Sequence, residues 1–509
     1  MASPKTQYHP LQWRKSPHGT WEREIDECEE FYNSSIRDGE GCYPVTSCAS
    51  FIIRTSDTVT TEEDEDRRIE NAFRKAWTIL HHDHPTLRSR VERSEDGIRW
   101  KRVYSTFEDE EEEKRWLDST FKAIDAEGAP LQWFNNTSAP FKISTLFLVK
   151  PKEKNNYHRH LFLRSPHDIT DGVGVLQLLN NLFKHAALAY EEGARYTLPA
   201  WGNEHERLSP CLRLVTETPR SFTESQIKRF EEIQTQNGII YTHPGLLSLP
   251  LSSNPTTSQH GKRQRVALSV SKATTENILR SCKTIAPGVS VTHVFTSALA
   301  LALSELQPRK EQSYAVRYAN QSMVNLRPHC RHPYNTPEHA AAAYHTVSAQ
   351  ALGVDLVVPA STDTGSERNV DQLSTIAIKV RDYFNTVRPV SPSDENIIFA
   401  PMVFKSLTAP PGLDPHAVSE TPFCPVPLSS IGNIASIVSP KHGPFELSSV
   451  WAASEPIGAG VAVFLATWDG NIELSGVFDT RYHNADYVEK FLGYILNCAL
   501  EGLGINWNL

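Results

Sequence analysis

The chain has 509 residues, of which 39% are hydrophobic and 22% are charged, and its formal net charge at pH 7 is −9. This composition is typical of a folded protein without a long disordered region, and the length exceeds what one hydrophobic core serves, so two or three domains are expected. The acidic balance argues against a nucleic-acid partner and against an anionic membrane surface.

Cysteine usage and the apolar runs bear on the compartment. The eight cysteines are scattered and form no Cys-x-x-Cys pair, which indicates buried thiols in a reducing compartment and no zinc site. No apolar run reaches the length of a membrane span, and the N-terminal residues do not have the pattern of a signal peptide. We therefore expect a cytoplasmic protein without a bound metal.

The first 150 residues carry strand patterns and one long helix. Residues 22–32 are compatible with a helix and residues 49–54 with a strand. Five acidic residues at 62–66 then precede apolar residues that recur three and four positions apart, which predicts an amphipathic helix with a negatively charged first turn. Residues 100–104 and 141–149 are further strand candidates.

Three histidines lie near the end of this predicted helix. They are His81, His82 and His84. A histidine cluster invites a metal interpretation, but the sequence supplies no further ligands at a recognisable spacing, so a metal site is disfavoured here.

The most informative stretch runs from residue 159 to residue 182. Residues 160–163 have the length and apolar character of a buried strand, which Pro166 should end. Apolar residues then recur at helical spacing from Val175 onward, so His167 is expected on the loop between strand and helix, and Asp171 at the first helical turn. A loop of this kind often carries a catalytic side chain. The simpler alternative is that the histidine hydrogen-bonds a carbonyl group and the aspartate only caps the helix.

The remainder of the chain has an irregular section followed by a second set of strands and helices. Residues 196–265 are rich in proline, serine and threonine, with one predicted helix at 224–237, and are interpreted as a crossover between two domains. The predicted elements of the second half are strands at 266–270, 429–434, 461–468 and 472–478, and helices at 292–306 and 485–500. Asp469 and Gly470 supply the turn between the last two strands.

Five separate stretches resemble, in the same order along the chain, the chloramphenicol-acetyltransferase-like superfamily of histidine-dependent acyltransferases. His167 to Gly172 resembles its His-x-x-x-Asp-Gly motif, and His84 to Arg88 resembles the His-Pro-x-Leu-Arg sequence that ends its first helix. Residues 289–292 resemble the start of its second domain, residues 324–328 the strand with its structural arginine, and residues 430–433 its Ser-x-Gly-Asn strand. The superfamily includes peptide condensation domains, plant alcohol acyltransferases and fungal trichothecene O-acetyltransferases.

Two departures from the usual superfamily motifs indicate which branch of the superfamily the chain resembles most. Condensation domains usually have a second histidine directly before the catalytic one, whereas this chain has Pro166 there. The chain also has no Asp-Phe-Gly-Trp-Gly sequence, which disfavours the plant branch. The resemblance is therefore nearest to the fungal trichothecene-type acyltransferases.

The resemblance implies an α/β fold built from two similar domains, each a mixed sheet flanked by helices, with a tunnel at their interface. We expect an N-terminal subdomain at residues 1–195, the crossover at 196–265 and a C-terminal subdomain at 266–509. The acyl donor would enter the tunnel from one side and the acceptor from the other, and the histidine would lie midway.

The resemblance also assigns roles to residues. His167 is the expected general base, and Asp171 is expected to point away from the substrate and pair with Arg327, which would hold the catalytic loop. Gly172 would allow the backbone and the donor to approach closely. Three polar residues of one strand are weaker candidates for stabilising the oxyanion, namely Ser429, Ser430 and Asn433.

The function implied is transfer of an acetyl or longer acyl group from an acyl-CoA co-substrate to a hydroxyl of a fungal secondary metabolite, a terpenoid or polyketide. No cofactor would be bound, and the protein would act as a monomer. The alternative is a condensation-like enzyme that takes its acyl chain from an acyl carrier protein. A third possibility is a binding protein that kept the fold and lost the chemistry, which the presence of His167, Asp171 and Arg327 disfavours.

Overall fold

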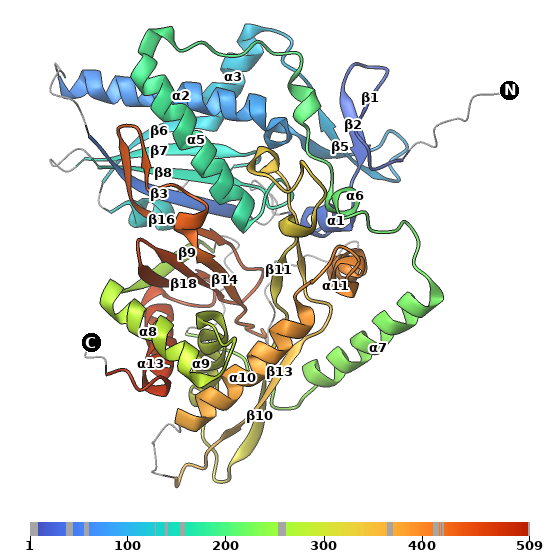
Figure 1. Ribbon diagram of the computed structural model, residues 1–509, viewed down its shortest axis with the longest axis vertical. Coiled ribbons are helices and arrows are strands. Elements are labelled where there is room, and N and C mark those ends of the chain that lie inside the picture. Colours follow the sequence, from blue (N-terminus) through green and yellow to red (C-terminus); the bar gives the residue numbers. More distant parts are fainter. Residues whose placement is uncertain are drawn as a thin grey trace.

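The computed structural model describes residues 9–36, 44–54, 61–127, 129–137, 141–152, 158–252, 261–363, 370–410, 417, 419 and 422–506. Residues 253–260, which belong to the predicted crossover, lie outside the described residues. Sheets and helices alternate through two lobes, so the expected α/β class is confirmed, and Figure 1 shows the first half of the chain above and most of the second half below.

The first lobe is built on a six-stranded mixed sheet in the order β15-β16-β3-β8-β7-β6. Its strands are β3 (Val45–Ile53), β6 (Phe121–Ala126), β7 (Thr145–Pro151), β8 (His158–Ser165), β15 (Lys441–His442) and β16 (Phe445–Ser454). All neighbouring pairs are antiparallel except β6 with β7. Helices α2 (Glu62–Asp83) and α5 (Gly172–Glu192) lie side by side over one face (Figure 1).

The spacing of apolar residues explains why α2 packs on this sheet. The residues that recur on one face of α2 are fully or almost fully buried; they are Ile69, Phe73, Ala76, Trp77 and Leu80. Phe73 meets Phe51 of β3 and Phe183 of α5 with ring centroids 5.5 and 5.4 Å apart. Each buried aromatic ring contributes about 1.5–3 kcal/mol through removal of apolar surface from water. Thr61 caps the helix through its hydroxyl, which accepts from the Asp64 N–H, and four acidic residues occupy the first turn as predicted.

The second lobe contains a four-stranded sheet in the order β14-β17-β18-β9. These strands are β9 (Arg263–Val270), β14 (Leu428–Asn433), β17 (Ala462–Trp468) and β18 (Asn471–Asp479). Asp469 and Gly470 form the predicted turn between β17 and β18, and both have positive φ angles, of 46° and 78°, as a type I′ turn requires. The helices of this lobe are α8 (Lys272–Ile285), α9 (Val291–Glu305), α10 (Val370–Val387) and α13 (Ala485–Gly502).

The second half of the chain contributes strands β15 and β16 to the first sheet. Strand β16 comes from the second half, yet it pairs antiparallel with β3 from Phe445 opposite Ile53 to Ser454 opposite Val45. The lower face of the first sheet also meets the second sheet through a buried cluster that includes Phe162 of β8, Trp451 of β16 and Phe464 of β17. The predicted domain boundary at residues 196–265 stays a prediction. It does not separate the two sheets, because residues 441–454 of the predicted C-terminal subdomain lie in the first sheet.

The described chain has further strands and α-helices besides these two sheets and the helices that cover them. The strands are β1 (Arg14–Lys15), β2 (Trp21–Glu24), β4 (Arg90–Arg93), β5 (Trp100–Tyr104), β10 (Tyr314–Asn320), β11 (Met323–Asn325), β12 (His345–Val347) and β13 (Leu352–Val358). The helices are α1 (Glu27–Asn33), α3 (Glu110–Thr120), α4 (Pro130–Thr137), α6 (Leu212–Val215), α7 (Glu224–Tyr241), α11 (Glu395–Ile398) and α12 (Ala400–Leu407). Among the described helices, none combines the length and the apolar composition needed to cross a bilayer.

Two sequence expectations for these smaller elements have different outcomes. The helix expected at 224–237 is present as α7, with Thr223 and Gln226 forming a capping box. The helix expected at 22–32 is wrong in its first part, because Trp21 to Glu24 pair with β5 as strand β2. The helix starts only after Asp26, whose carboxylate accepts from the Glu29 N–H and acts as the N-cap.

Candidate active site

The loop that carries the His-x-x-x-Asp-Gly motif joins a central strand to a buried helix. Strand β8 ends at Ser165, and α5 begins at Gly172. The Asp171 carboxylate caps α5, because its Oδ1 atom accepts hydrogen bonds from the N–H groups of Val173 at 3.1 Å and Gly174 at 2.8 Å. His167 therefore lies on a short connection that is fixed at both ends by regular structure.

The His167 imidazole lies between residues of the two halves of the chain. One face of the imidazole is covered by the stacked ring of Tyr32 from α1. The ring centroids are 4.3 Å apart, and the angle between the ring planes is 7°. The ring of His345, from β12 in the second half, is 5.4 Å away. His167 is only 5% exposed. Burial, and next the neighbouring charge of His345, lower the pKa of His167 to about 3, so the imidazole is neutral at physiological pH and able to accept a proton.

Asp171 points into the second half of the chain. Its Oδ2 atom pairs with the Arg327 guanidinium and accepts a hydrogen bond from the Tyr344 N–H at 2.8 Å. Arg327 also donates to the Ala342 carbonyl oxygen at 2.6 Å. Burial alone would raise the pKa of Asp171. The charge of Arg327, the contact with His345 and the hydrogen bond from the Gly174 N–H instead hold this pKa well below its usual range. The expected Asp171–Arg327 contact is thus present, as an ionised pair that joins the loop to the other half.

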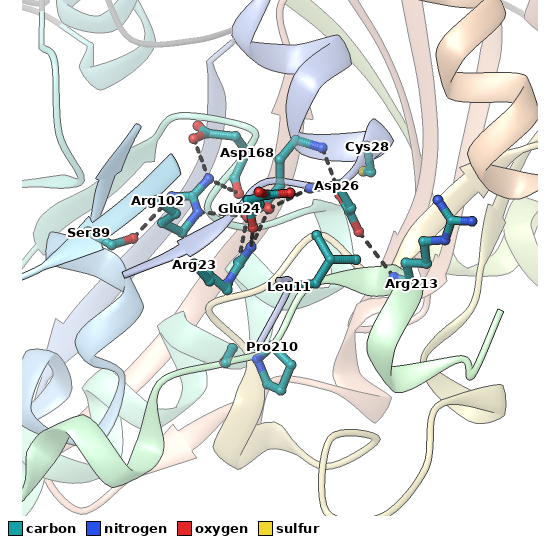
Figure 2. Close-up of polar contacts among 12 residues, drawn as sticks. Leu11, Arg23, Glu24, Asp26, Cys28, Ser89, Arg102, Asp168, Pro210 and Arg213 are labelled. Carbon is teal, nitrogen blue, oxygen red and sulfur yellow. Dashed lines mark hydrogen bonds and ion pairs between the residues drawn. The ribbon is translucent and has the colours of Figure 1, made fainter. Parts of the chain in front are cut away.

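The loop has a second ionic anchor, which involves the residue next to His167. Asp168 Oδ2 accepts from Arg102 Nη2 at 2.7 Å, and Figure 2 shows the Arg102 guanidinium placed between Asp168 and Ser89. Arg102 Nε also donates to Glu29 Oε1 at 2.6 Å. Glu29 in turn receives two hydrogen bonds from Arg23, at 2.6 and 2.7 Å. Although burial alone would raise it, the charges of Arg102 and Arg23 lower the pKa of Glu29 to about 2.

This buried network ties the loop of His167 to β5 and α1. Arg102 is fully buried, so its charge has no water to solvate it and depends on Glu29 and Asp168. The sequence analysis missed it because Asp168 lies 66 residues from Arg102, and Glu29 lies 73 residues from it on the other side. No local spacing indicates that these charges meet.

We predict that Arg102→Met destabilises the protein by about 3–5 kcal/mol, because the substitution leaves the buried Glu29 and the partly buried Asp168 without their shared cation. Thermal or denaturant unfolding measures the change. Arg99→Met is the matched control, since Arg99 directly precedes β5, the strand of Arg102, and its exposed side chain pairs with Glu24. Equal losses of stability in the two variants would contradict the role given to the buried network.

Gly174, which the sequence analysis did not single out, is the glycine that the close packing of the loop requires. A Cβ atom at Gly174 would lie 2.4 Å from the Ala340 carbonyl oxygen and 2.5 Å from Arg327 Nη2, whereas a Cβ atom at Gly172 would have no protein atom within 4 Å. Other parts of the protein therefore approach the backbone closely at Gly174 and not at Gly172. The open side of Gly172 remains compatible with the predicted approach of a donor.

We expect Gly174→Ala to destabilise the protein by about 1–3 kcal/mol, because the added methyl group displaces Arg327 or the chain at Ala340. Gly172→Ala should leave the unfolding temperature unchanged, and it should raise the KM for the acyl donor if the donor passes this backbone. Differential scanning calorimetry and steady-state kinetics on both variants check this. Wild-type kinetics in Gly172→Ala would contradict the prediction that the donor approaches the backbone at Gly172.

The predicted oxyanion residues lie on β14, at a bulge of the sheet between Ser430 and Gly432. Ser430 shares a hydrogen bond of 2.8 Å with the Thr292 hydroxyl, and the Asn433 side-chain oxygen accepts from the Ala435 N–H at 3.2 Å. Neither of these contacts involves His167. Stabilisation of the oxyanion by Ser429, Ser430 or Asn433 therefore stays a prediction.

The histidines at the end of α2 have packing roles. His81 Nδ1 contacts the Trp77 carbonyl oxygen at 3.1 Å, His84 Nε2 lies 3.2 Å from the Asn181 amide, and His82 contacts Arg207. Within the described part of the chain, no group of three or more histidine, cysteine, aspartate or glutamate residues is arranged to hold a metal ion.

Comparisons with known proteins agree with the fold. No protein-family model matches the chain. Acetyltransferase pigO of Monascus ruber is 24% identical over 510 residues, which cover 97% of this chain and 99% of the relative. The structure resembles TRI3 trichothecene 15-O-acetyltransferase from Fusarium sporotrichioides, with a TM-score of 0.75, 16% identity and coverage of 97% of this chain and 99% of that chain. It also resembles the first condensation domain of the CDA synthetase, with a TM-score of 0.59, 13% identity and coverage of 95% and 97%.

The chain has the same two-lobed fold as the O-acetyltransferase and condensation-domain structures, and its histidine loop is anchored in both halves. Together with the relative of nearly the same length, these features confirm the resemblance found in the sequence. The shared fold and the acetyltransferase relative together support an acyltransferase enzyme.

Proposed function

We propose that the chain is an O-acyltransferase that moves an acetyl group from acetyl-CoA, or a related acyl group from another acyl-CoA, to a hydroxyl of a fungal secondary metabolite such as a terpenoid or polyketide. The observation that carries the proposal is the neutral His167 imidazole between the two halves, on a loop held by the Asp171–Arg327 pair. The acetyltransferase relative and the similar O-acetyltransferase structure support the choice of acetyl group and hydroxyl acceptor.

The proposed reaction is a direct transfer. His167 accepts the proton of the acceptor hydroxyl as the hydroxyl oxygen attacks the thioester carbonyl carbon. The carbon–oxygen bond forms, the carbon–sulfur bond then breaks, and the imidazolium returns the proton to the departing thiolate. One side chain thus serves as base and then as acid, and no covalent acyl-enzyme is formed.

The low pKa of His167 has a consequence for the pH profile of kcat/KM. A histidine with an ordinary pKa near 6.5 would lose about thirtyfold of its basic form between pH 8 and pH 5. Because burial favours the neutral imidazole in this protein, we expect kcat/KM to fall far less over that range, wherever circular dichroism shows the fold intact. A titration centred near pH 6.5 would contradict a buried, neutral base.

The assay that tests the proposal follows free thiol release from acetyl-CoA in the presence of a panel of alcohols. Thiol release that depends on an alcohol, with formation of its ester, supports the proposal, and transfer from a loaded acyl carrier protein alone supports a condensation-like enzyme instead. Product formation from neither donor would favour a binding protein. The same assay with longer acyl-CoA donors measures the preferred acyl length.

A further inference from the structure

Tyr32 makes the closest described ring contact with His167, and it comes from a distant part of the sequence. It lies in α1, and its side chain is almost fully buried. Its ring covers the His167 imidazole almost in parallel, at 4.3 Å and 7°. Its phenol oxygen shares a hydrogen bond of 2.7 Å with His345 Nε2.

His345 connects this phenol back to the catalytic loop. Its Nδ1 atom is 3.6 Å from Asp171 Oδ2, so this side of the ring faces the carboxylate. Its Nε2 atom, on the opposite side of the ring, shares the hydrogen bond with the Tyr32 hydroxyl. The contacts form a closed circuit from His167 through Tyr32 and His345 to Asp171, which lies on the same loop as His167.

The orientation of a histidine ring needs such support. The second side-chain torsion of histidine is broad, so rotation of the ring about its bond to Cβ is only weakly restrained by the residue itself. A general base must direct one nitrogen at the proton that it accepts, and small misplacements reduce rates strongly. A stacked ring permits sliding in the plane but opposes rotation out of it.

We propose that Tyr32 is a positioning residue for the acyltransfer reaction: its ring fixes the plane of the His167 imidazole, and His345 holds the phenol in place from the other half of the chain. This inference rests on the proposed function, because it assigns Tyr32 to the geometry of the proposed base. Neither residue needs to contact a substrate in this role.

The residues of α1 define the experiment and its control. Tyr32→Leu removes the stacked ring, Tyr32→Phe keeps the ring and removes the hydrogen bond to His345, and Phe31→Leu changes an aromatic neighbour on the same helix. Phe31 packs on Tyr32 and Phe404 with ring centroids 5.0 and 5.7 Å away, so its substitution loosens the packing of α1 while leaving the Tyr32 ring in place.

We expect Tyr32→Leu to lower kcat by about tenfold to a hundredfold with little change in either KM, because the substrates still bind while the base is misdirected. Tyr32→Phe should recover most of this loss, and Phe31→Leu should leave kcat per folded molecule unchanged. Adding Tyr32→Phe to His345→Asn should lower kcat no further than His345→Asn alone, because the hydrogen bond that Tyr32→Phe removes is already absent in that variant. Equal kcat in Tyr32→Leu and Phe31→Leu would overturn the inference.

A crystal structure of Tyr32→Leu separates this inference from the proposed function. We expect the His167 ring to rotate or to occupy more than one orientation once the stacked phenol is absent. An unchanged ring would overturn the positioning role, whether or not the protein transfers acyl groups. If wild-type protein transferred no acyl group from acyl-CoA to any alcohol, that result would instead count against the proposed function alone.

Discussion

His167→Ala is expected to abolish acyl transfer while the protein remains folded. General base catalysis by a positioned histidine contributes about 10²–10⁴-fold to a rate, and in the proposed mechanism the same imidazole also reprotonates the leaving thiolate. Removing it deprives both halves of the reaction of their proton carrier. The measurement is alcohol-dependent thiol release by purified protein, together with the thermal unfolding midpoint.

A second buried histidine serves as the control for this substitution. His160 lies on β8, the strand that leads to the catalytic loop, and its Nδ1 atom is 2.8 Å from the Ser50 hydroxyl. Burial lowers the pKa of His160 to about 4, so its burial and neutrality resemble those of His167. His160→Ala should retain turnover per folded molecule. Wild-type turnover in His167→Ala would end the proposed mechanism.

Asp171→Asn is expected to reduce stability by about 3–5 kcal/mol and, under the proposed mechanism, to reduce the rate as well. The substitution is nearly isosteric and keeps an oxygen that can cap α5, but it removes the charge that neutralises the buried Arg327. The loop that directs His167 then loses its tie to the second half. Denaturant unfolding and steady-state kinetics on the same preparation measure the two effects.

The double variant Asp171→Asn with Arg327→Met separates structural support from proton transfer. Removing the orphaned guanidinium should restore part of the stability lost in Asp171→Asn, because an unpaired buried charge is worse than none. Activity should stay low, since the loop remains untied. If Asp171→Asn slowed the reaction severely without any loss of stability, a direct role of Asp171 in proton transfer would replace the structural role.

Short-range patterns were sufficient to predict much of the fold near the site. The strand before Pro166, the capping of α5 by Asp171 and the turn at Asp469 and Gly470 depend on neighbouring residues, and all are present. The contact between Asp171 and Arg327 spans 156 residues and was accessible only through the resemblance to a known superfamily.

No pattern among neighbouring residues in the sequence indicates the remaining site residues. Tyr32 and His345 are separated by 313 residues and belong to short elements without a strong periodic pattern. Gly174 lies two residues beyond the motif, and the crowding around it involves atoms of Ala340 and Arg327 that arrive from the other half. The exchange of β16 into the first sheet was equally hidden, because an apolar strand pattern does not indicate which sheet the strand joins.

The most direct test of the central claim is a crystal structure with a thioether analogue of acetyl-CoA, in which a methylene group between sulfur and carbonyl prevents transfer. Our account predicts that the analogue reaches the junction of the two lobes and places its carbonyl carbon within about 5 Å of the His167 imidazole, leaving room for one hydroxyl oxygen between them. An analogue bound with its carbonyl remote from this ring would contradict the account.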